Sequence, residues 1–237
     1  MTLPLANDMR YGWMTSMDSA ASVRQVVALA ERVGLDSLWV GDHIAFAVPI
    51  MDPLLQLAQA AVLSDRLLLG TSVYLLPLRH AVAVAKQVAT LDRLTSGRLL
   101  FGVGVGGEFP NEYAACGVPI KERGARLSEG IEVLRKLWSG APVSHAGRFY
   151  PFENVQMLPA PSQPGGPPIW CGGRSEAALA RAGRLADGYV SYVVTPEMFA
   201  GFLETIEKSA AAAKREMDRF DTAHLLFFRI DNSFETA

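Results

Sequence analysis

Residues 167–189, PPIWCGGRSEAALARAGRLADGY, decide the fold class, because they place a strand, a turn and a helix in immediate succession. The run IWCGG is short and apolar and follows two prolines, which is typical of a buried strand. The alanine-rich segment after Ser175 has the composition of a helix, and serine is a favoured helix N-cap. A second apolar run, DGYVSYV (187–193), follows the helix. The stretch therefore predicts a strand–helix–strand unit with parallel strands.

The same rhythm runs along the chain, with near-continuous apolar runs between helical patterns, as in a parallel sheet covered by helices. Strands are expected at 9–13, 37–42, 67–73, 98–105, 167–173, 187–193 and 223–230. Helices are expected at 22–34, 53–65, 81–97, 125–140, 175–186 and 196–218, with Gly34, Gly97 and Gly140 as stops. Seven such units predict an α/β fold of the TIM (β/α)8-barrel type, and an open doubly wound sheet is the alternative.

Two long segments interrupt this rhythm. Residues 107–122 follow the fourth strand, and residues 141–166, rich in proline, glycine and aromatic residues, precede the fifth. Insertions of this length in a compact domain are usually functional. We expect one domain over residues 1–237 with an insertion at about 141–166. The last βα unit of an eight-stranded barrel is expected to be missing or atypical, because little sequence follows the seventh strand.

Composition narrows the function classes. The 237 residues carry a net charge of -2 and are half hydrophobic, with no block of like charge, so neither nucleic acid nor an anionic membrane is an expected partner. No apolar run is long enough to span a membrane, and the N-terminus does not resemble a secretory signal. The two cysteines, Cys116 and Cys171, have no metal-site spacing, which fits a reducing cytoplasm.

In a βα barrel, catalytic groups lie at the C-terminal ends of the strands. Asp42 and His43 end the second predicted strand, where they could act as an oriented acid/base pair; a capping aspartate and a structural histidine are the alternative. Ser72 and Val73 end the third strand after small residues that would let a flat ring approach the backbone.

The fourth strand ends in glycines and a carboxylate. The spacing of Gly104, Gly106 and Gly107 does not fit the dinucleotide fingerprint, so the loop with Glu108 and Asn111 is interpreted as lining a ligand. Glu108 could equally be a solvated loop residue. No metal-ligand spacing, barrel lysine or nucleophile elbow is found, which disfavours a metal hydrolase, a Schiff-base aldolase and a serine hydrolase.

Gly172 and Gly173 stand where the fifth strand passes into a helix, and two explanations are open. The turn could simply be tight, or an anion could approach bare backbone N–H groups at the helix N-terminus. Arg174 could then clamp the anion or point to solvent. We favour a phosphate site here and expect it to involve the turn as a whole: Cys171, Gly172, Gly173, Arg174 and Ser175.

Five stretches, GLDSLWVGDHI, LLLGTSV, AKQVATLDRLTSGRLLFGVGVG, ERGARLSEGIEVLRKLW and residues 167–189, resemble the bacterial luciferase-like superfamily. Within it they most resemble oxidoreductases that depend on the deazaflavin coenzyme F420. The resemblance runs in order from about residue 9 to residue 200. It implies a TIM barrel, a homodimer, and a flavin or deazaflavin across the C-terminal ends of the strands. Segments 52–64 and 80–96 are apolar on several faces, as a subunit interface would require.

The resemblance also assigns residues. It implies His43 and Glu108 as catalytic groups, and a non-proline cis peptide at Ser72–Val73 beneath the cofactor ring. It implies that Gly172 and Gly173 hold the cofactor phosphate and that Thr195 lies at the next strand end. The remaining expected cofactor contacts are Asp42, Gly106, Gly107 and Asn111.

The sequence therefore predicts an oxidoreductase that exchanges hydride between coenzyme F420 and a small organic substrate. An FMN-dependent monooxygenase on the same barrel is the first alternative. A non-catalytic flavin-binding homologue is the second.

Overall fold

The computed structural model describes residues 2–229, 231 and 233. The strands are β1 (Gly12–Met14), β2 (Ser37–Val40), β3 (Leu68–Thr71), β4 (Leu99–Val103), β5 (Val143–His145), β6 (Phe152–Val155), β7 (Ile169–Gly172), β8 (Gly188–Tyr192) and β9 (Asp221–Leu225). The α-helices are α1 (Ala20–Arg32), α2 (Pro53–Ala61), α3 (Ala81–Leu94), α4 (Pro110–Ala115), α5 (Arg123–Trp138), α6 (Glu176–Leu185) and α7 (Pro196–Ala212). Two short 3-10 helices, η1 (Leu76–Leu78) and η2 (Ile120–Glu122), complete the described elements.

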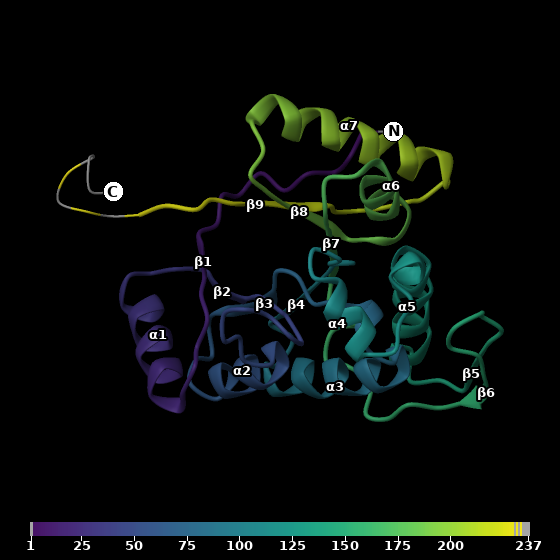
Figure 1. Cartoon of the computed structure of the whole chain (residues 1–237), viewed down its shortest axis with the longest axis horizontal. Helices are drawn as coiled ribbons and strands as arrows, with labels where there is room; N and C mark the ends of the chain where they lie inside the picture. Colours follow the sequence, from purple (N-terminus) through teal and green to yellow (C-terminus); the bar gives the residue numbers. More distant parts are fainter. Residues whose placement is uncertain (1, 230, 232, 234–237) are drawn as a thin grey trace.

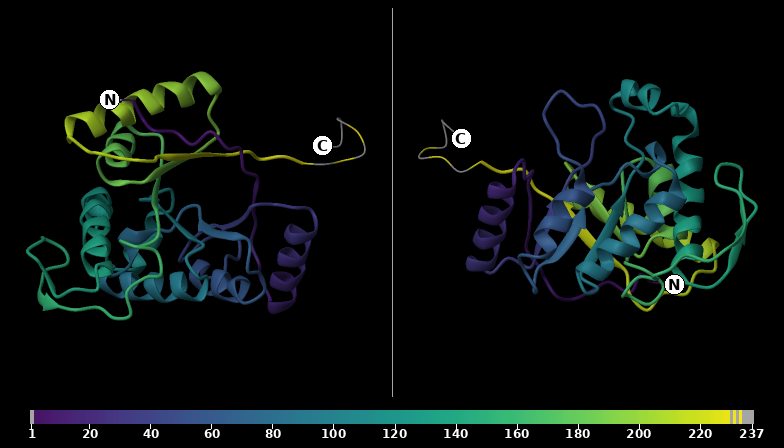
Figure 2. Two further views of the ribbon diagram at one scale, coloured as in Figure 1. Left: turned by 180° about the vertical axis from the view of Figure 1, so that it is seen from behind. Right: turned by 90° about the horizontal axis from the view of Figure 1, so that it is seen from below.

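Seven parallel strands form one sheet in the order β1-β2-β3-β4-β7-β8-β9. Each barrel strand pairs with the next one along the chain, whereas the order of an open doubly wound sheet reverses at a switch point. Figures 1 and 2 show the helices on the outside of the sheet, with α2 and α3 on one side and α6 and α7 on the opposite side. The predicted barrel class is confirmed, and the open sheet is wrong.

The barrel is nearly closed. Its edges are β1 and β9, and a parallel bridge between Leu5 and Phe220 links the segments that lead into them. The Phe220 N–H donates to the Pro4 carbonyl oxygen over 2.9 Å. The strand predicted at 223–230 begins earlier and ends at Leu225, and its residue 230 lies outside the described residues. The barrel sheet has no eighth strand in the described part of the chain.

The interruptions predicted between the fourth and fifth barrel strands are present and contain elements that the pattern did not predict. Residues 107–122 include α4 and η2, and residues 141–166 include the antiparallel pair β5–β6. Glu129 on α5 fastens the second insertion, because its carboxylate accepts the N–H groups of Phe149 and Tyr150, each over 2.8 Å.

Helix ends follow the predicted signals. Ser175 caps α6, and its side chain accepts the Ala178 N–H. Gly34, Gly97 and Gly140 all have positive φ, the conformation that suits glycine after a helix.

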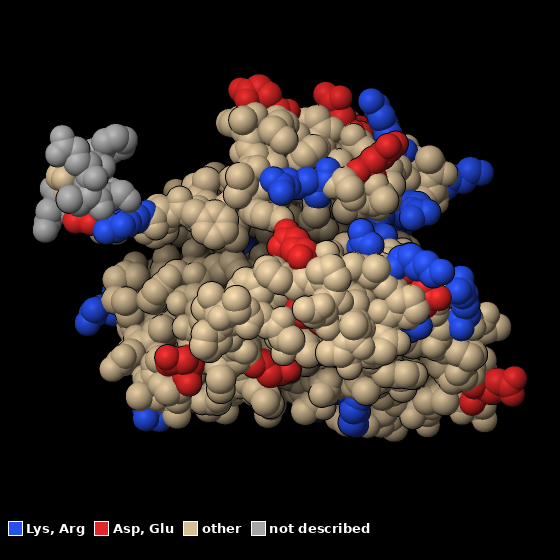
Figure 3. Space-filling model, viewed as in Figure 1, with Lys and Arg blue, Asp and Glu red and all other residues tan. Residues whose placement is uncertain are grey.

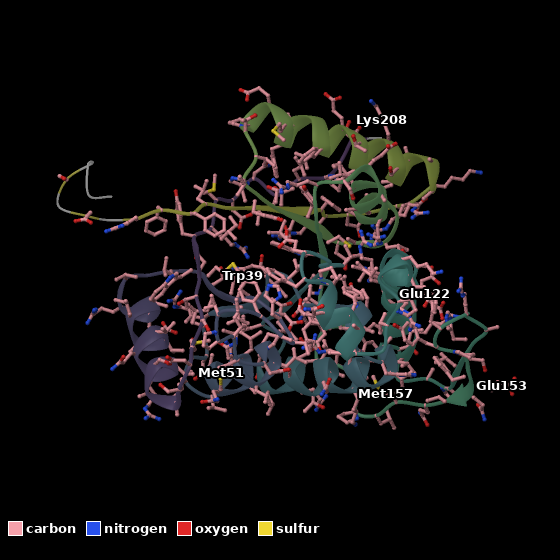
Figure 4. The ribbon with its side chains drawn as sticks, viewed as in Figure 1. Trp39, Met51, Glu122, Glu153, Met157 and Lys208 are labelled. Carbon is pink, nitrogen blue, oxygen red and sulfur yellow. The ribbon has the colours of Figure 1, made fainter. Side chains whose placement is uncertain are left out.

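Two indole rings fill part of the barrel interior. Trp39 on β2 and Trp170 on β7 lie 5.3 Å apart between ring centroids. Figure 4 shows Trp39 on the side of β2 that faces β8 and β9. Glycines make the space: a Cβ on Gly70 would lie 2.3 Å from the Trp39 ring, and one on Gly188 would lie 2.6 Å from the Trp170 ring.

We predict that Gly70→Ala destabilises the protein by about 1–3 kcal/mol, the usual cost of overpacking a core, because the Trp39 ring would have to shift, although its Nε1 donates to the Ser37 hydroxyl over 2.8 Å. Gly201 lies on α7, and Gly201→Ala is the matched control, since a Cβ there would have no atom within 4 Å outside its own helical turn. Alanine there should raise helix stability by about 0.5–1 kcal/mol. Urea unfolding measures both free energies, and an unchanged midpoint for Gly70→Ala would contradict the packing argument.

Candidate active site

The loop after β2 and the short helix α4 bring a histidine and a buried carboxylate together. His43 Nδ1 lies 3.1 Å from Oε2 and 3.2 Å from Oε1 of Glu112. The Glu112 side chain is 1% exposed and that of His43 is 22% exposed. Both segments follow the C-terminal ends of barrel strands, where the sequence placed the site.

Backbone hydrogen bonds hold the Glu112 carboxylate in this position. Its Oε1 accepts the N–H of Ile44 over 2.6 Å and that of Ala45 over 3.0 Å. Burial alone would raise the pKa of Glu112, but hydrogen bonds from Ala45, His43 and Ile44 outweigh it and lower the pKa from its ordinary value of 4.5. The carboxylate is therefore ionised near neutral pH.

Aromatic rings fix the plane of the His43 imidazole. Phe46 stacks on it with ring centroids 4.1 Å apart and planes 9° apart. Phe109 meets it edge-on at 5.5 Å. The ring is thus held on one face by Phe46 and at Nδ1 by Glu112, a geometry suited to directed proton transfer.

Asp42 does not orient His43. Its carboxylate forms a two-point ion pair with Arg79, with Nη2 to Oδ1 at 2.9 Å, and its Oδ2 accepts the Leu75 N–H over 2.8 Å. The expected Asp42–His43 pair is wrong, since Glu112 occupies that role. Asp42 instead ties the end of β2 to the segment that leads into α3.

The peptide bond between Ser72 and Val73 is cis, as the resemblance implied. The Val73 side chain lies where neighbouring strands carry glycine. A Cβ on Gly104 would lie 2.3 Å from Val73 Cγ2, and one on Gly172 would lie 2.8 Å from its Cγ1. The glycines at the ends of β4 and β7 therefore make room for this valine.

Glu108 joins a cluster that crosses the mouth from the β4 loop to the β8 loop. It accepts a hydrogen bond from the Tyr192 hydroxyl over 3.2 Å, and the Arg174 guanidinium lies 4.7 Å from the centre of the Tyr192 ring. Gly106 and Gly107 precede it with positive φ, and a Cβ on Gly107 would lie 3.2 Å from Arg123 Nε. Glu108 is exposed, so it lines the rim and is separate from the His43 pair.

The backbone geometry of the turn from β7 into α6 requires a glycine at its second glycine position, Gly173. Gly173 has φ +121°, and a Cβ there would lie 2.8 Å from Ala178. A bulky residue at Gly173 would therefore strain the turn itself and would not probe an anion site cleanly. The first turn of α6 follows with Ser175 as its N-cap, and Thr195 caps α7 in the same manner.

Cys171 and Asn111, both predicted to contact the cofactor, differ in solvent exposure. Cys171 is 1% exposed within the core, and burial raises the pKa of its thiol to about 12. The thiol is buried, so the predicted part of Cys171 in the phosphate-binding turn would have to come from its backbone, and it stays a prediction. Asn111, on the first turn of α4, is exposed.

Two further properties concern the described residues only. They contain no group of three or more histidine, cysteine or acidic side chains arranged to hold a metal ion. None of their helices has the length and hydropathy needed to cross a membrane.

The fold and these residues define a parallel βα barrel with a histidine–glutamate pair at its strand ends. The chain belongs to the luciferase-like monooxygenase family, whose model matches residues 4–237. An F420-dependent glucose-6-phosphate dehydrogenase of Nakamurella multipartita is 29% identical over 240 residues, covering 96% of this chain and 70% of that protein. The F420-dependent glucose-6-phosphate dehydrogenase of Beutenbergia cavernae is 36% identical over 195 residues, which cover 77% of this chain and 56% of that protein.

Solved structures agree with the fold. Monooxygenase RslO1 from Streptomyces bottropensis is 27% identical with a TM-score of 0.78, covering 90% of this chain and 70% of that one. The coenzyme F420-dependent tetrahydromethanopterin reductase from Methanopyrus kandleri is 23% identical with a TM-score of 0.82, and the match covers 96% of this chain and 68% of that one. The latter similarity supports the barrel architecture.

We predict that Asp42→Ala destabilises the protein by about 3–5 kcal/mol, the usual cost of removing one partner from a buried ion pair. The loss follows because the Leu75 N–H would lose its acceptor and Arg79 would keep only the longer contact with Asp52, at 3.7 Å. Asp65→Ala removes an exposed carboxylate and should change stability by less than about 0.5 kcal/mol. Chemical denaturation gives both values, and equal stabilities of the two variants would refute a tethering role for Asp42.

Proposed function

We propose that this protein is an oxidoreductase that exchanges hydride between coenzyme F420 and a small organic substrate. The observation that carries the proposal is the His43–Glu112 pair, held in a fixed orientation at the strand ends of a luciferase-like barrel. Relatives named as F420-dependent glucose-6-phosphate dehydrogenases support the choice of coenzyme. Glucose 6-phosphate is accordingly the first substrate to test.

The charge distribution at the mouth suits an anionic cofactor. Arg123 and Arg174 flank the Gly107–Glu108 loop, and neither forms an ion pair with a carboxylate of the described residues. The first turn of α6, capped by Ser175, presents backbone N–H groups beside Arg174. Figure 3 shows Lys and Arg side chains over α5 and α6 on this face of the molecule. These groups would hold the phosphate of F420.

The reaction assigns distinct roles to the chain's own residues. When bound, F420 supplies a two-electron hydride donor or acceptor. His43 holds or releases the proton that accompanies hydride exchange, and Glu112 keeps its ring in place. Ser72–Val73 supports the flat ring system from the end of β3. Glu108 and Tyr192 line the rim on the substrate side, with Asn111 and Thr195 as outer contacts.

An FMN-dependent monooxygenase is the second candidate. It is favoured by the similarity to RslO1, which is named a monooxygenase. Titration of the purified protein with F420 and with FMN, followed by absorbance and mass spectrometry of the retained cofactor, separates the two. Failure to bind either would favour a non-catalytic homologue.

We predict that His43→Ala binds F420 nearly as tightly as the wild type but turns over about 10²–10⁴-fold more slowly with a competent substrate, the usual contribution of a general acid/base. His80→Ala is the control, because His80 is exposed and its ring packs against Tyr150 of the insertion. Steady-state kinetics and a binding titration measure both effects. If His43→Ala lost affinity and kept its turnover number, His43 would be a binding residue.

We predict that Arg174→Gln weakens F420 binding about tenfold, because one charge-assisted contact to the phosphate is lost. Arg184→Gln removes an equivalent charge from the last turn of α6 and should leave the affinity unchanged. Fluorescence titration at constant ionic strength measures both dissociation constants. Equal affinities of the two variants would favour the tight-turn explanation for Gly172 and Gly173.

We also propose that the protein is a cytoplasmic homodimer that assembles through α2 and the end of α3. Leu55 and Val62 on and beside α2 are 68% and 74% exposed, and Leu94 at the end of α3 is 51% exposed. Apolar side chains gathered on one surface are typical of subunit interfaces.

Leu55→Glu should shift the dimer toward monomer, since it would bury a charge in the proposed interface. Val33→Glu, at a comparably exposed apolar position after α1, should not. Light scattering at micromolar concentration measures both masses. A monomeric wild type would count against the assembly.

A further inference from the structure

The two oxygens of Glu112 have different partners. Oε1 accepts both backbone N–H groups, from Ile44 at 2.6 Å and Ala45 at 3.0 Å. Oε2 accepts neither of them and lies 3.1 Å from His43 Nδ1, slightly nearer than Oε1 at 3.2 Å. An ionised carboxylate can only accept hydrogen bonds, so the atom opposite Oε2 has to carry a proton.

We propose that Glu112 is a positioning residue that keeps neutral His43 in the tautomer with its proton on Nδ1, so that Nε2 is the atom free to accept a proton. A 180° turn of the ring about Cβ–Cγ would keep its plane but would place the carbon Cδ2 against Glu112, so Nδ1 is the ring atom that can form the hydrogen bond. The catalytic consequence rests on the proposed function, whereas the tautomer does not.

Because of this arrangement, the variant Glu112→Gln tests whether Glu112 selects the tautomer of His43. The Ile44 and Ala45 N–H groups both need an acceptor, so the amide oxygen of glutamine takes the Oε1 position. The amide NH₂ then occupies the Oε2 position and donates to His43 Nδ1. The variant keeps the shape of the site but should move the imidazole proton to Nε2.

Nitrogen-15 NMR of the imidazole rings reads the tautomer directly, without substrate or cofactor. The chain has four histidines, and the His43 signals are identified by their loss in His43→Asn. Spectra are recorded at pH values where the ring is neutral. The wild type is expected to show a protonated Nδ1 and an unprotonated Nε2. The opposite tautomer in the wild type would overturn the proposal, even if the glutamine variant failed to fold.

Glu112→Gln is expected to show the Nε2-protonated form. Glu129→Gln is the matched control, because Glu129 is another carboxylate on a helix that accepts backbone N–H groups near a histidine, His145. It should leave the His43 signals unchanged. Persistence of the Nδ1 proton in Glu112→Gln, or the same His43 shift in the control, would show that Glu112 does not select the tautomer.

Kinetics separate this inference from the proposed function. If His43 is the acid/base group, Glu112→Gln should lower the turnover number about 10–100-fold with little change in the KM for F420, because Nε2 no longer accepts a proton. An inverted tautomer with unchanged turnover would retain the positioning role and reject the catalytic role of His43. An unchanged tautomer would reject the positioning role whatever the activity.

Discussion

The barrel interior has to hold two indole rings, and this constraint connects the sequence with the architecture. Trp39 and Trp170 meet across the sheet, from strands that are not neighbours. The space for them exists because their paired residues on the adjacent strands β3 and β8, Gly70 and Gly188, carry no Cβ. Side-chain positions alternate along a strand, so a shift of one residue would replace these glycines with larger groups. The packing therefore fixes the register of the strands and, through it, the common level of their C-terminal ends.

At those ends, two buried carboxylates connect segments that are distant in sequence. Asp42 holds the segment before α3 through Arg79 and the Leu75 N–H. Glu112 holds the loop after β2 from the opposite side, through its two backbone hydrogen bonds. His43 lies directly after one carboxylate and against the other. Its position thus depends on two separate links, both formed by the protein alone, which is the preorganisation that efficient proton transfer requires.

The sequence predicted the fold more completely than the site. Periodicity and glycine stops located the barrel strands and six helices, because these elements bury continuous apolar faces. The sequence analysis did not predict α4 or the β5–β6 pair, because these elements are short and have no strong hydrophobic pattern of their own. The site error follows from the first omission. Glu108 and Glu112 are four residues apart in one loop sequence, and only the presence and orientation of α4 shows that Glu112 is the buried one. The cis peptide at Ser72–Val73 was predicted correctly, from resemblance alone.

Because the pKa of Glu112 is lowered, both the stability of the fold and the arrangement of the His43 ring depend on pH. A carboxyl group whose pKa is lower in the folded than in the unfolded chain stabilises the fold fully above its ordinary value, here 4.5, and loses that contribution as pH falls through the lowered value. Protonation would also turn an obligate acceptor into a donor beside His43. The arrangement of the imidazole therefore depends on the ionised state of a residue on α4. Near neutral pH that state is secured by the Ile44 and Ala45 N–H groups, so the loop that carries His43 also stabilises the charge that orients it.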